Sequence, residues 1–211
     1  YGSDYIYRYS TFIKGGSLIS SFVQSSFKGE DINISYLDVV ISCFIQVLAN
    51  EIFLKNLVMR YISTEHVSSI NLQVFYNNLQ ITLFFIEHSQ SLSGSFYQGG
   101  FNKLDMSDGI LINCWTGSFG FYEYSSAGSI CAIESNIVFI ATTIFHVGRS
   151  DERGGAVTAV WNNIVKIDNC FFARNEAPNR EAKGGVIQLF FTNNVSCETT
   201  VFFLNYGSNG G

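Results

Sequence analysis

The sequence predicts an all-β protein, folded as a parallel β-helix of about seven coils. One motif recurs in the second half of the chain, in copies that start at positions 127, 154 and 184. Inside each copy the apolar residues alternate with a period of two, which is typical of strands with one buried face. Because a unit of this size cannot bury its own apolar face, the copies have to stack. No linker divides the chain, so we expect a single β-helix domain over residues 1–211.

Each copy starts with a glycine-rich opening and closes with a phenylalanine eighteen residues after its first position. The openings stand at 127–130, 154–157 and 184–187. The clearest repeats are therefore 127–153, 154–183 and 184–209. The closing residues are Phe145, Phe172 and Phe202. Since these rings share one position in the repeat, we expect them to stack in a single interior column.

An asparagine stands nine residues into each copy, at Asn136, Asn163 and Asn193. In stacked coils these side chains would lie about 4.8 Å apart, which is the distance between neighbouring strands. Amides at that spacing can satisfy one another's donors and acceptors in a ladder. Alternatively, asparagine is used because it tolerates the left-handed backbone of a turn. Both interpretations give the same fold.

The first half of the chain carries weaker copies of the motif, and before residue 98 the sequence does not determine the coil register. Gly99-Gly100 resembles an opening, and the stretch 113–115 then matches 169–171. Residues 68–85 form a degenerate copy of the motif, and this copy also fits a leucine-rich repeat. That pattern occurs once, and the double glycine of the other copies is foreign to it, so we favour the β-helix.

The two full openings are paired with closings of the form Phe-x-x-Asn. Gly-Gly-Ala-Val at 154–157 pairs with 172–175, and Gly-Gly-Val-Ile at 184–187 pairs with 202–205. This pairing resembles the repeat of polymorphic outer membrane proteins, over the two copies at 154–183 and 184–209. The copy at 127–153 departs from the pattern. The resemblance implies a right-handed, pectate-lyase-like β-helix that is displayed on a cell surface or secreted.

The composition is typical of a sheet-rich protein, with 47% hydrophobic residues, 20 phenylalanines and one proline. The 12 basic and 17 acidic residues include no basic run, which argues against a nucleic-acid partner. The longest apolar run, Val39 to Ala49, is too short to span a membrane. The chain begins with Tyr1 and shows no signal peptide, so we expect it to be a fragment of a longer chain.

The five cysteines form no Cys-x-x-Cys pair and lie near no histidine cluster. We therefore expect no metal and no cofactor, and we interpret the cysteines as small core residues. Cys114 and Cys170 occupy similar positions but a full coil apart, which is beyond the reach of a disulfide.

A carbohydrate-active enzyme is the alternative function. Asp168 and Glu198 both stand fourteen residues into their copies, so we expect them to be neighbours on adjacent coils, with Lys166 on the same outward face. Two carboxylates about 5 Å apart can perform acid–base chemistry on a glycosidic bond, as in a polysaccharide lyase or glycoside hydrolase. One coil back the corresponding residue is Ala141, which limits the acidic cluster to two residues.

We expect instead a non-enzymatic, adhesin-like protein that binds glycans, matrix proteins or cell-surface proteins through a lateral strand face. A regular stack offers a long face with side chains repeated at the coil spacing. The aromatic anchors of that face would be Phe139, Trp161 and Phe191, because aromatic residues dominate interface energies.

Two Asn-x-Ser sequons, at Asn33 and Asn194, are candidate glycosylation sites and favour an extracellular location. Asn194 occupies a position that Ile137 and Ile164 hold in the earlier copies. We therefore expect Asn194 to be the poorer acceptor of the two.

Overall fold

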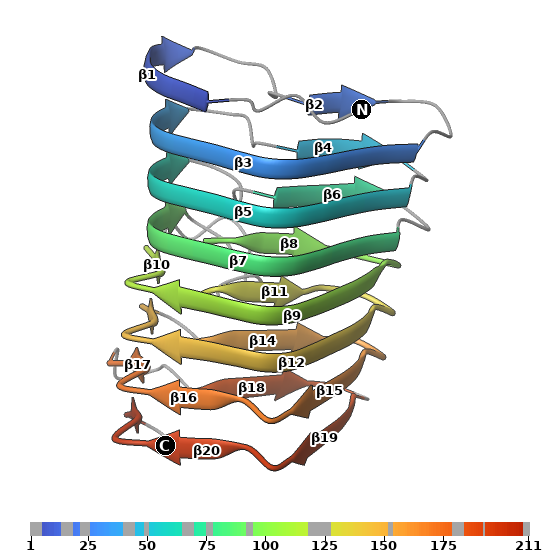
Figure 1. Cartoon of the computed structure of the whole chain (residues 1–211). Helices are drawn as coiled ribbons and strands as arrows, with labels where there is room; N and C mark the ends of the chain where they lie inside the picture. Colours follow the sequence, from blue (N-terminus) through green and yellow to red (C-terminus); the bar gives the residue numbers. More distant parts are fainter. Residues whose placement is uncertain are drawn as a thin grey trace.

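The protein consists of stacked β-strands. The structure, a computed structural model of the whole chain, describes residues 6–13, 19–21, 26–39, 45–48, 51–64, 70–74, 78–91, 95–117, 128–151, 154–178, 184–191 and 193–208. Every regular element within these residues is a strand, and the strand pairs are parallel. Figure 1 shows them stacked as one column, from β1 at the top to β20 at the bottom. The predicted all-β parallel β-helix is therefore confirmed, while its right-handed sense stays a prediction.

The strands form two sheets, of fourteen and seven strands in the described part of the chain. The larger sheet begins with four long or curved strands, β1 (Ile6–Ile13), β3 (Ser26–Val39), β5 (Glu51–Thr64) and β7 (Asn78–Ser91). It continues with β9 (Lys103–Ile112), β10 (Trp115–Thr116), β12 (Ile137–His146), β13 (Arg149–Ser150), β15 (Ile164–Asp168), β16 (Phe171–Ala173), β17 (Glu176–Ala177), β19 (Asn194–Glu198), β20 (Val201–Phe203) and β21 (Tyr206–Gly207). The smaller sheet takes one strand from each coil: β2 (Ile19–Ser21), β4 (Ile45–Leu48), β6 (Ile70–Val74), β8 (Tyr97–Gly99), β11 (Ile130–Ala132), β14 (Val157–Val160) and β18 (Ile187–Phe190).

The pairing register gives the length of each coil. One column contains the first residues of successive strands: Ser26, Glu51, Asn78, Lys103, Ile137, Ile164 and Asn194. The coil from Ser26 to Glu51 is among the shortest, and the coil from Lys103 to Ile137 is the longest of this column. Coils of similar length therefore continue upstream of residue 98, where the sequence motif does not determine the register.

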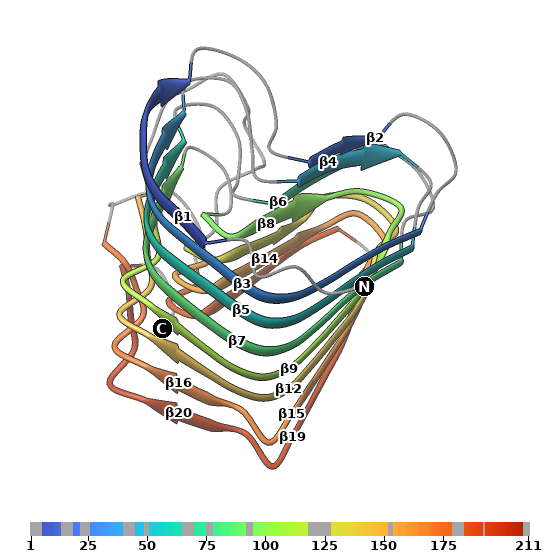
Figure 2. The same ribbon diagram turned by 45° about the horizontal axis from the view of Figure 1, so that its top comes forward.

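A corner divides each coil of the larger sheet into two walls. It is rounded in β3, β5 and β7, and it is sharp between β15 and β16 and between β19 and β20 (Figure 2). One residue per coil has a positive φ there, between 47° and 57°: Asp31, Asn56, Leu83, Asp108, Thr142, Asn169 and Thr199. A single left-handed residue turns the chain while the strands on both sides keep their ladders. We call the segments before this corner the first wall, those after it the second wall, and the seven-stranded sheet the third wall.

The predicted phenylalanine column is confirmed in its register. Phe145, Phe172 and Phe202 are paired in sequence across β12, β16 and β20. The Phe145 and Phe172 rings lie 4.5 Å apart between centroids and are buried, and Phe202 stacks on Phe172 at 5.2 Å. Phe202 itself is 48% exposed, because it lies on the last coil that the structure describes.

The predicted asparagine ladder is also present. The side-chain amide of Asn136 donates to Asn163 Oδ1 at 2.8 Å, and that of Asn163 donates to Asn193 Oδ1 at 2.9 Å. Each of these oxygens also accepts the backbone N–H of the preceding asparagine. Asn175 and Asn205 form a second ladder with the same geometry, with an amide-to-oxygen distance of 3.0 Å. Both ladders satisfy amides that the stacked coils remove from water.

One part of the sequence register is wrong. Gly99 pairs with Ala132 inside the third wall, and Tyr97 pairs with Ile130, so this coil opens at Ser95, level with Gly128. Gly99 is needed for space rather than for a turn, because a Cβ there would lie 2.4 Å from the Tyr97 hydroxyl.

The same error affects the predicted match of Cys114 with Cys170. Trp115 pairs with Arg149, whereas Phe171 pairs with Ile144. The two cysteines therefore occupy different positions in the coil.

Candidate functional site

The outward side chains of the first wall place the two predicted carboxylates side by side. Asp168 on β15 pairs with Glu198 on β19, and Ala141 on β12 is the next residue of that column. Both acidic side chains are exposed, as is Lys166 on the same face. Neighbouring strands are about 4.8 Å apart, which is within the range for two cooperating carboxyl groups.

The side chain of Lys166, beside the Asp168–Glu198 pair, lies over an aromatic ring. The Lys166 ammonium lies 5.4 Å from the centre of the Phe139 ring on the preceding coil. On the other side of Phe139, the Lys103 ammonium lies 5.8 Å from the same ring and is paired with Asp105 at 2.8 Å. Phe139 is thus the centre of a cation–π arrangement on the first wall.

The other two predicted anchors lie elsewhere. Trp161 and Phe191 are at the turns that lead from the third wall into β15 and β19, with φ values of 60° and 61°. Their rings stack at 5.4 Å with an angle of 18° between planes, and Phe191 is 62% exposed. Trp161 and Phe191 therefore do not share a strand face with Phe139, because they lie at the turns before β15 and β19. A binding role for the three aromatic residues stays a prediction.

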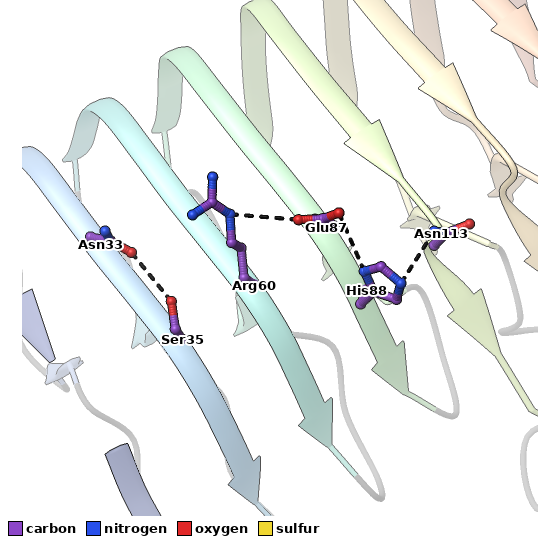
Figure 3. Close-up of polar contacts among 6 residues, drawn as sticks. All are labelled: Asn33, Ser35, Arg60, Glu87, His88 and Asn113. Atoms are coloured by element: carbon purple, nitrogen blue, oxygen red, sulfur yellow. Dashed lines mark hydrogen bonds and ion pairs between the residues drawn. The ribbon is translucent and has the colours of Figure 1, made fainter. Parts of the chain in front are cut away.

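Both sequon asparagines have exposed side chains. Asn33 lies on the second wall in β3, where the Ser35 hydroxyl is 3.4 Å from its Oδ1 (Figure 3). Asn194 lies at the start of β19 on the outer side of the first wall. Ile137 and Ile164, which hold its position in earlier coils, are each 39% exposed, so this position faces outward. The reason for expecting Asn194 to be the poorer acceptor is therefore removed.

A cluster that the sequence did not indicate lies on the outer side of the second wall (Figure 3). The Arg60 cluster, as we call it, consists of Arg60, Tyr61, Phe85, Glu87, His88 and Asn113. Arg60 Nε lies 3.5 Å from Glu87 Oε2, and its guanidinium carbon lies 5.2 Å from the centre of the Phe85 ring.

The second half of this cluster is centred on an imidazole. His88 Nδ1 lies 3.6 Å from Glu87 Oε1, and His88 Nε2 lies 3.3 Å from the amide nitrogen of Asn113. Tyr61 stacks on His88 with 4.9 Å between ring centroids. The contacts join β5, β7 and the residue after β9, so three successive coils contribute. The signal that could have found the cluster is its spacing, because Tyr61, His88 and Asn113 follow one another at intervals close to the length of one coil.

The cysteines show no sign of a nucleophilic role in the described part of the chain. Cys114, Cys131 and Cys170 are buried free thiols and Cys197 is exposed. Burial raises the pKa of the Cys114 thiol to about 11 and also raises the pKa of Cys170 and of Cys197. A raised pKa disfavours the reactive thiolate.

Two further kinds of site are absent from the described residues. No group of three or more His, Cys, Asp or Glu side chains there is placed to hold a metal ion. Nor does that part of the chain contain a helix with the length and apolar character needed to cross a membrane.

The geometry defines the chain as a parallel β-helix with exposed aromatic and polar clusters on its walls. No protein-family model matches it, and no match was found among curated proteins or solved structures. The resemblance to the polymorphic outer membrane protein repeat therefore stays a prediction.

Proposed function

We propose that this chain is a non-enzymatic β-helix, displayed on a cell surface or secreted, that binds an extended partner such as a glycan along its side. The observation that carries this proposal is the Trp161–Phe191 stack, a rigid aromatic pair that remains partly exposed to solvent. Aromatic side chains present large contact areas at low cost in conformational entropy, and they dominate binding energies when a partner covers them.

The regular spacing of the coils favours a partner that is itself extended. Side chains of one column repeat at about 4.8 Å, so a chain-like ligand running along the solenoid meets equivalent positions several times. Weak contacts that repeat in this way add up through effective concentration. The exposed sequon residues Asn33 and Asn194 agree with an extracellular location.

A binding screen with matched variants tests the proposal. Purified protein is applied to arrays of polysaccharides and extracellular-matrix proteins, and we expect Trp161→Ala and Phe191→Ala to lose most of the binding. Phe203→Ala is the matched control, because Phe203 is also an exposed phenylalanine of the last coil but lies on the second wall. Equal losses in all three variants would contradict a specific role for the stack.

A carbohydrate-active enzyme is the second candidate, favoured by the adjacency of Asp168 and Glu198. The same polysaccharides are assayed for new reducing ends and for unsaturated products. Turnover by the wild-type protein that disappears in Asp168→Asn, with folding intact, would replace the binding proposal. We expect no turnover, because the pair stands on an open wall where Ala141 ends the acidic column.

A further inference from the structure

We propose that the Arg60 cluster is a second binding site, and that it takes an uncharged sugar ring with neighbouring hydroxyl groups. This site rests on the proposed function, since both treat the chain as a glycan-binding protein. It lies on the second wall, however, and shares no residue with the Trp161–Phe191 stack. The two sites can therefore succeed or fail separately.

The polar contacts of the cluster have defined partners. Arg60 and Glu87 form an ion pair, in which Arg60 Nε lies 3.5 Å from Glu87 Oε2. The amide nitrogen of Asn113 lies 3.3 Å from His88 Nε2, and it can donate there to the tautomer of His88 in which Nε2 is an acceptor. The other ring nitrogen, His88 Nδ1, lies 3.6 Å from Glu87 Oε1.

This arrangement holds polar groups in place for a ligand. The contacts above involve Nε of Arg60 and the amide nitrogen of Asn113, so the terminal guanidinium N–H groups and Asn113 Oδ1 can serve a ligand. The Glu87 oxygens have further lone pairs. A sugar hydroxyl both donates and accepts, so neighbouring hydroxyls can pair with a donor and an acceptor of the cluster at once.

The aromatic part of the cluster offers an apolar surface beside these polar groups. Tyr61 and His88 form a stacked pair that is 44% and 43% exposed, respectively. Binding sites for small ligands combine such apolar surface with a few fixed polar groups. A sugar ring has the matching amphipathic character, with C–H groups on its faces and hydroxyls at its edge.

The charge of the cluster argues for an uncharged ligand. It contains one guanidinium and one carboxylate, which are already paired with each other. The carboxylate of a uronic acid would have to approach Glu87 as well as Arg60, and like charges brought together disfavour binding. The net charge of −5 for the whole chain acts in the same direction.

The backbone makes the site rigid. Tyr61, His88 and Asn113 form a second corner column, with φ values of 55°, 52° and 53°. The strands that precede this corner are paired from Arg60 to Glu87 and from Glu87 to Ile112. Side chains fixed on paired strands lose little freedom when a ligand binds, which favours affinity.

The test compares uncharged hexose oligosaccharides with uronic-acid oligosaccharides of the same stereochemistry, using calorimetry and NMR shift mapping on the full chain. For an uncharged probe we expect shifts at residues 60, 87, 88 and 113, and a loss in affinity of about tenfold in Arg60→Lys and in Glu87→Gln. Lysine keeps the charge but not the planar set of donors. The control is Arg149→Lys, since Arg149 has a similarly exposed side chain (49% against 46%) and pairs with Asp151 and Glu176.

The possible outcomes distinguish the Arg60 cluster from the Trp161–Phe191 stack. Tighter binding of the uronic-acid probes, or equal losses in Arg60→Lys and Arg149→Lys, would overturn the Arg60 site. Binding that is lost in Trp161→Ala but kept in Arg60→Lys would also overturn it, while leaving the proposed function standing. Loss in Arg60→Lys with binding kept in Trp161→Ala supports it. If no probe binds the wild-type protein and no NMR shifts are seen, both proposed binding sites are contradicted.

Discussion

The coils before residue 98 and those after residue 127 build the same cross-section from different side chains. One interior column passes through Ile34, Met59, Ile86 and Leu111, and then through Phe145, Phe172 and Phe202. In the upstream coils, β3, β5 and β7 are strands of 14 residues that run through the corner, whereas in the last coils the strands are shorter. The downstream coils add stacked rings and two asparagine ladders.

The spacing between coils is set by the backbone hydrogen bonds between paired strands, and both regions share these strand ladders. Aliphatic side chains of similar volume can replace one another in such a core, so they leave no fixed motif. Stacked rings and amide ladders form only when the same residue type recurs at one position of the coil. These contacts therefore leave a recognisable motif in the sequence. We therefore expect the downstream coils to be the more sensitive to single substitutions.

The largest effect is expected for Phe172→Ala. This ring is fully buried between Phe145 and Phe202, so its removal leaves a cavity and ends both stacking contacts. We expect the free energy of unfolding, measured by guanidinium denaturation, to fall by about 3–5 kcal/mol.

Two control substitutions test whether this loss of stability depends on the ring stack of the downstream coils. Met59→Ala removes a buried residue from the same column upstream and should cost less, because no ring stack is lost. Lys166→Ala changes an exposed residue and should stay within about 0.5 kcal/mol. A greater loss for Met59→Ala than for Phe172→Ala would reverse the order of the two regions.

Asn163→Ala is expected to have the next largest effect. Asn163 Oδ1 accepts from the backbone and side chain of Asn136, and its amide donates to Asn193 Oδ1 and to the carbonyl of Val160. Each buried group left without a partner costs about 1–3 kcal/mol. The control Asn194→Ala changes the exposed asparagine beside Asn193 and should leave the unfolding midpoint nearly unchanged. Similar losses for both variants would show that the ladder adds nothing to the strand pairing.

The sequence predicted much of the downstream half, because its ladders depend on recurrence. The regular spacing of the motif placed Asn136, Asn163 and Asn193 in one column, and it placed Asp168 beside Glu198. Asn102, directly before β9, extends the column: its backbone N–H donates to Asn136 Oδ1 at 3.1 Å. In the sequence, asparagine also precedes β5 and β7, at positions 50 and 77, which lie outside the described residues. An asparagine directly before β5, β7, β9 and β12 is the signal that could have fixed the register from residue 50 onward.

The Arg60 cluster could not be predicted in the same way. Its members share no residue type at a common interval, since Tyr61, His88 and Asn113 differ chemically while occupying one column. Only the coil lengths bring them together, and those lengths differ between coils, as the short coil that ends at Glu51 and the long one that ends at Ile137 show. The alternation of apolar residues places Trp161 and Phe191 on a strand face, because alternation alone does not show where a strand begins.

An alkaline titration tests the coil that joins the two regions, which contains Tyr97 and Cys114. Burial raises the pKa of both groups, and for Cys114 it raises the pKa from 9.0 to about 11. A group that is harder to ionise in the folded protein stabilises the fold fully below its unfolded pKa, and this contribution is lost as the pH rises through the folded pKa. Because one proton is released on unfolding in this window, the folding equilibrium constant should fall by about tenfold per pH unit for Cys114 between pH 9 and 11.

The matched variant for this titration is Cys114→Ala, which removes the ionising thiol. Its stability should depend less steeply on pH than that of the wild-type protein in this window, even if it is lower at pH 7. Identical slopes would mean that the thiol does not contribute to alkaline unfolding.

The smallest expected effect is a gain, from Leu83→Asn in the upstream region. Leu83 is exposed and has a φ of 54°, at a corner where Asp31, Asn56, Asp108 and Asn169 occupy the same column. A left-handed conformation costs about 1–2 kcal/mol for most residues, but asparagine adopts it more easily because its side chain bonds locally. Asn56 already donates to Asp31 Oδ1 at 2.6 Å, so an amide at position 83 could extend this contact by one coil. We expect the free energy of unfolding to rise by up to about 1 kcal/mol. Leu83→Ala should bring no such gain, since alanine keeps the steric conflict and has no amide. A loss of stability in Leu83→Asn would mean that the leucine side chain packs usefully at this corner, and that the upstream coils depend on aliphatic contacts even on their outer side.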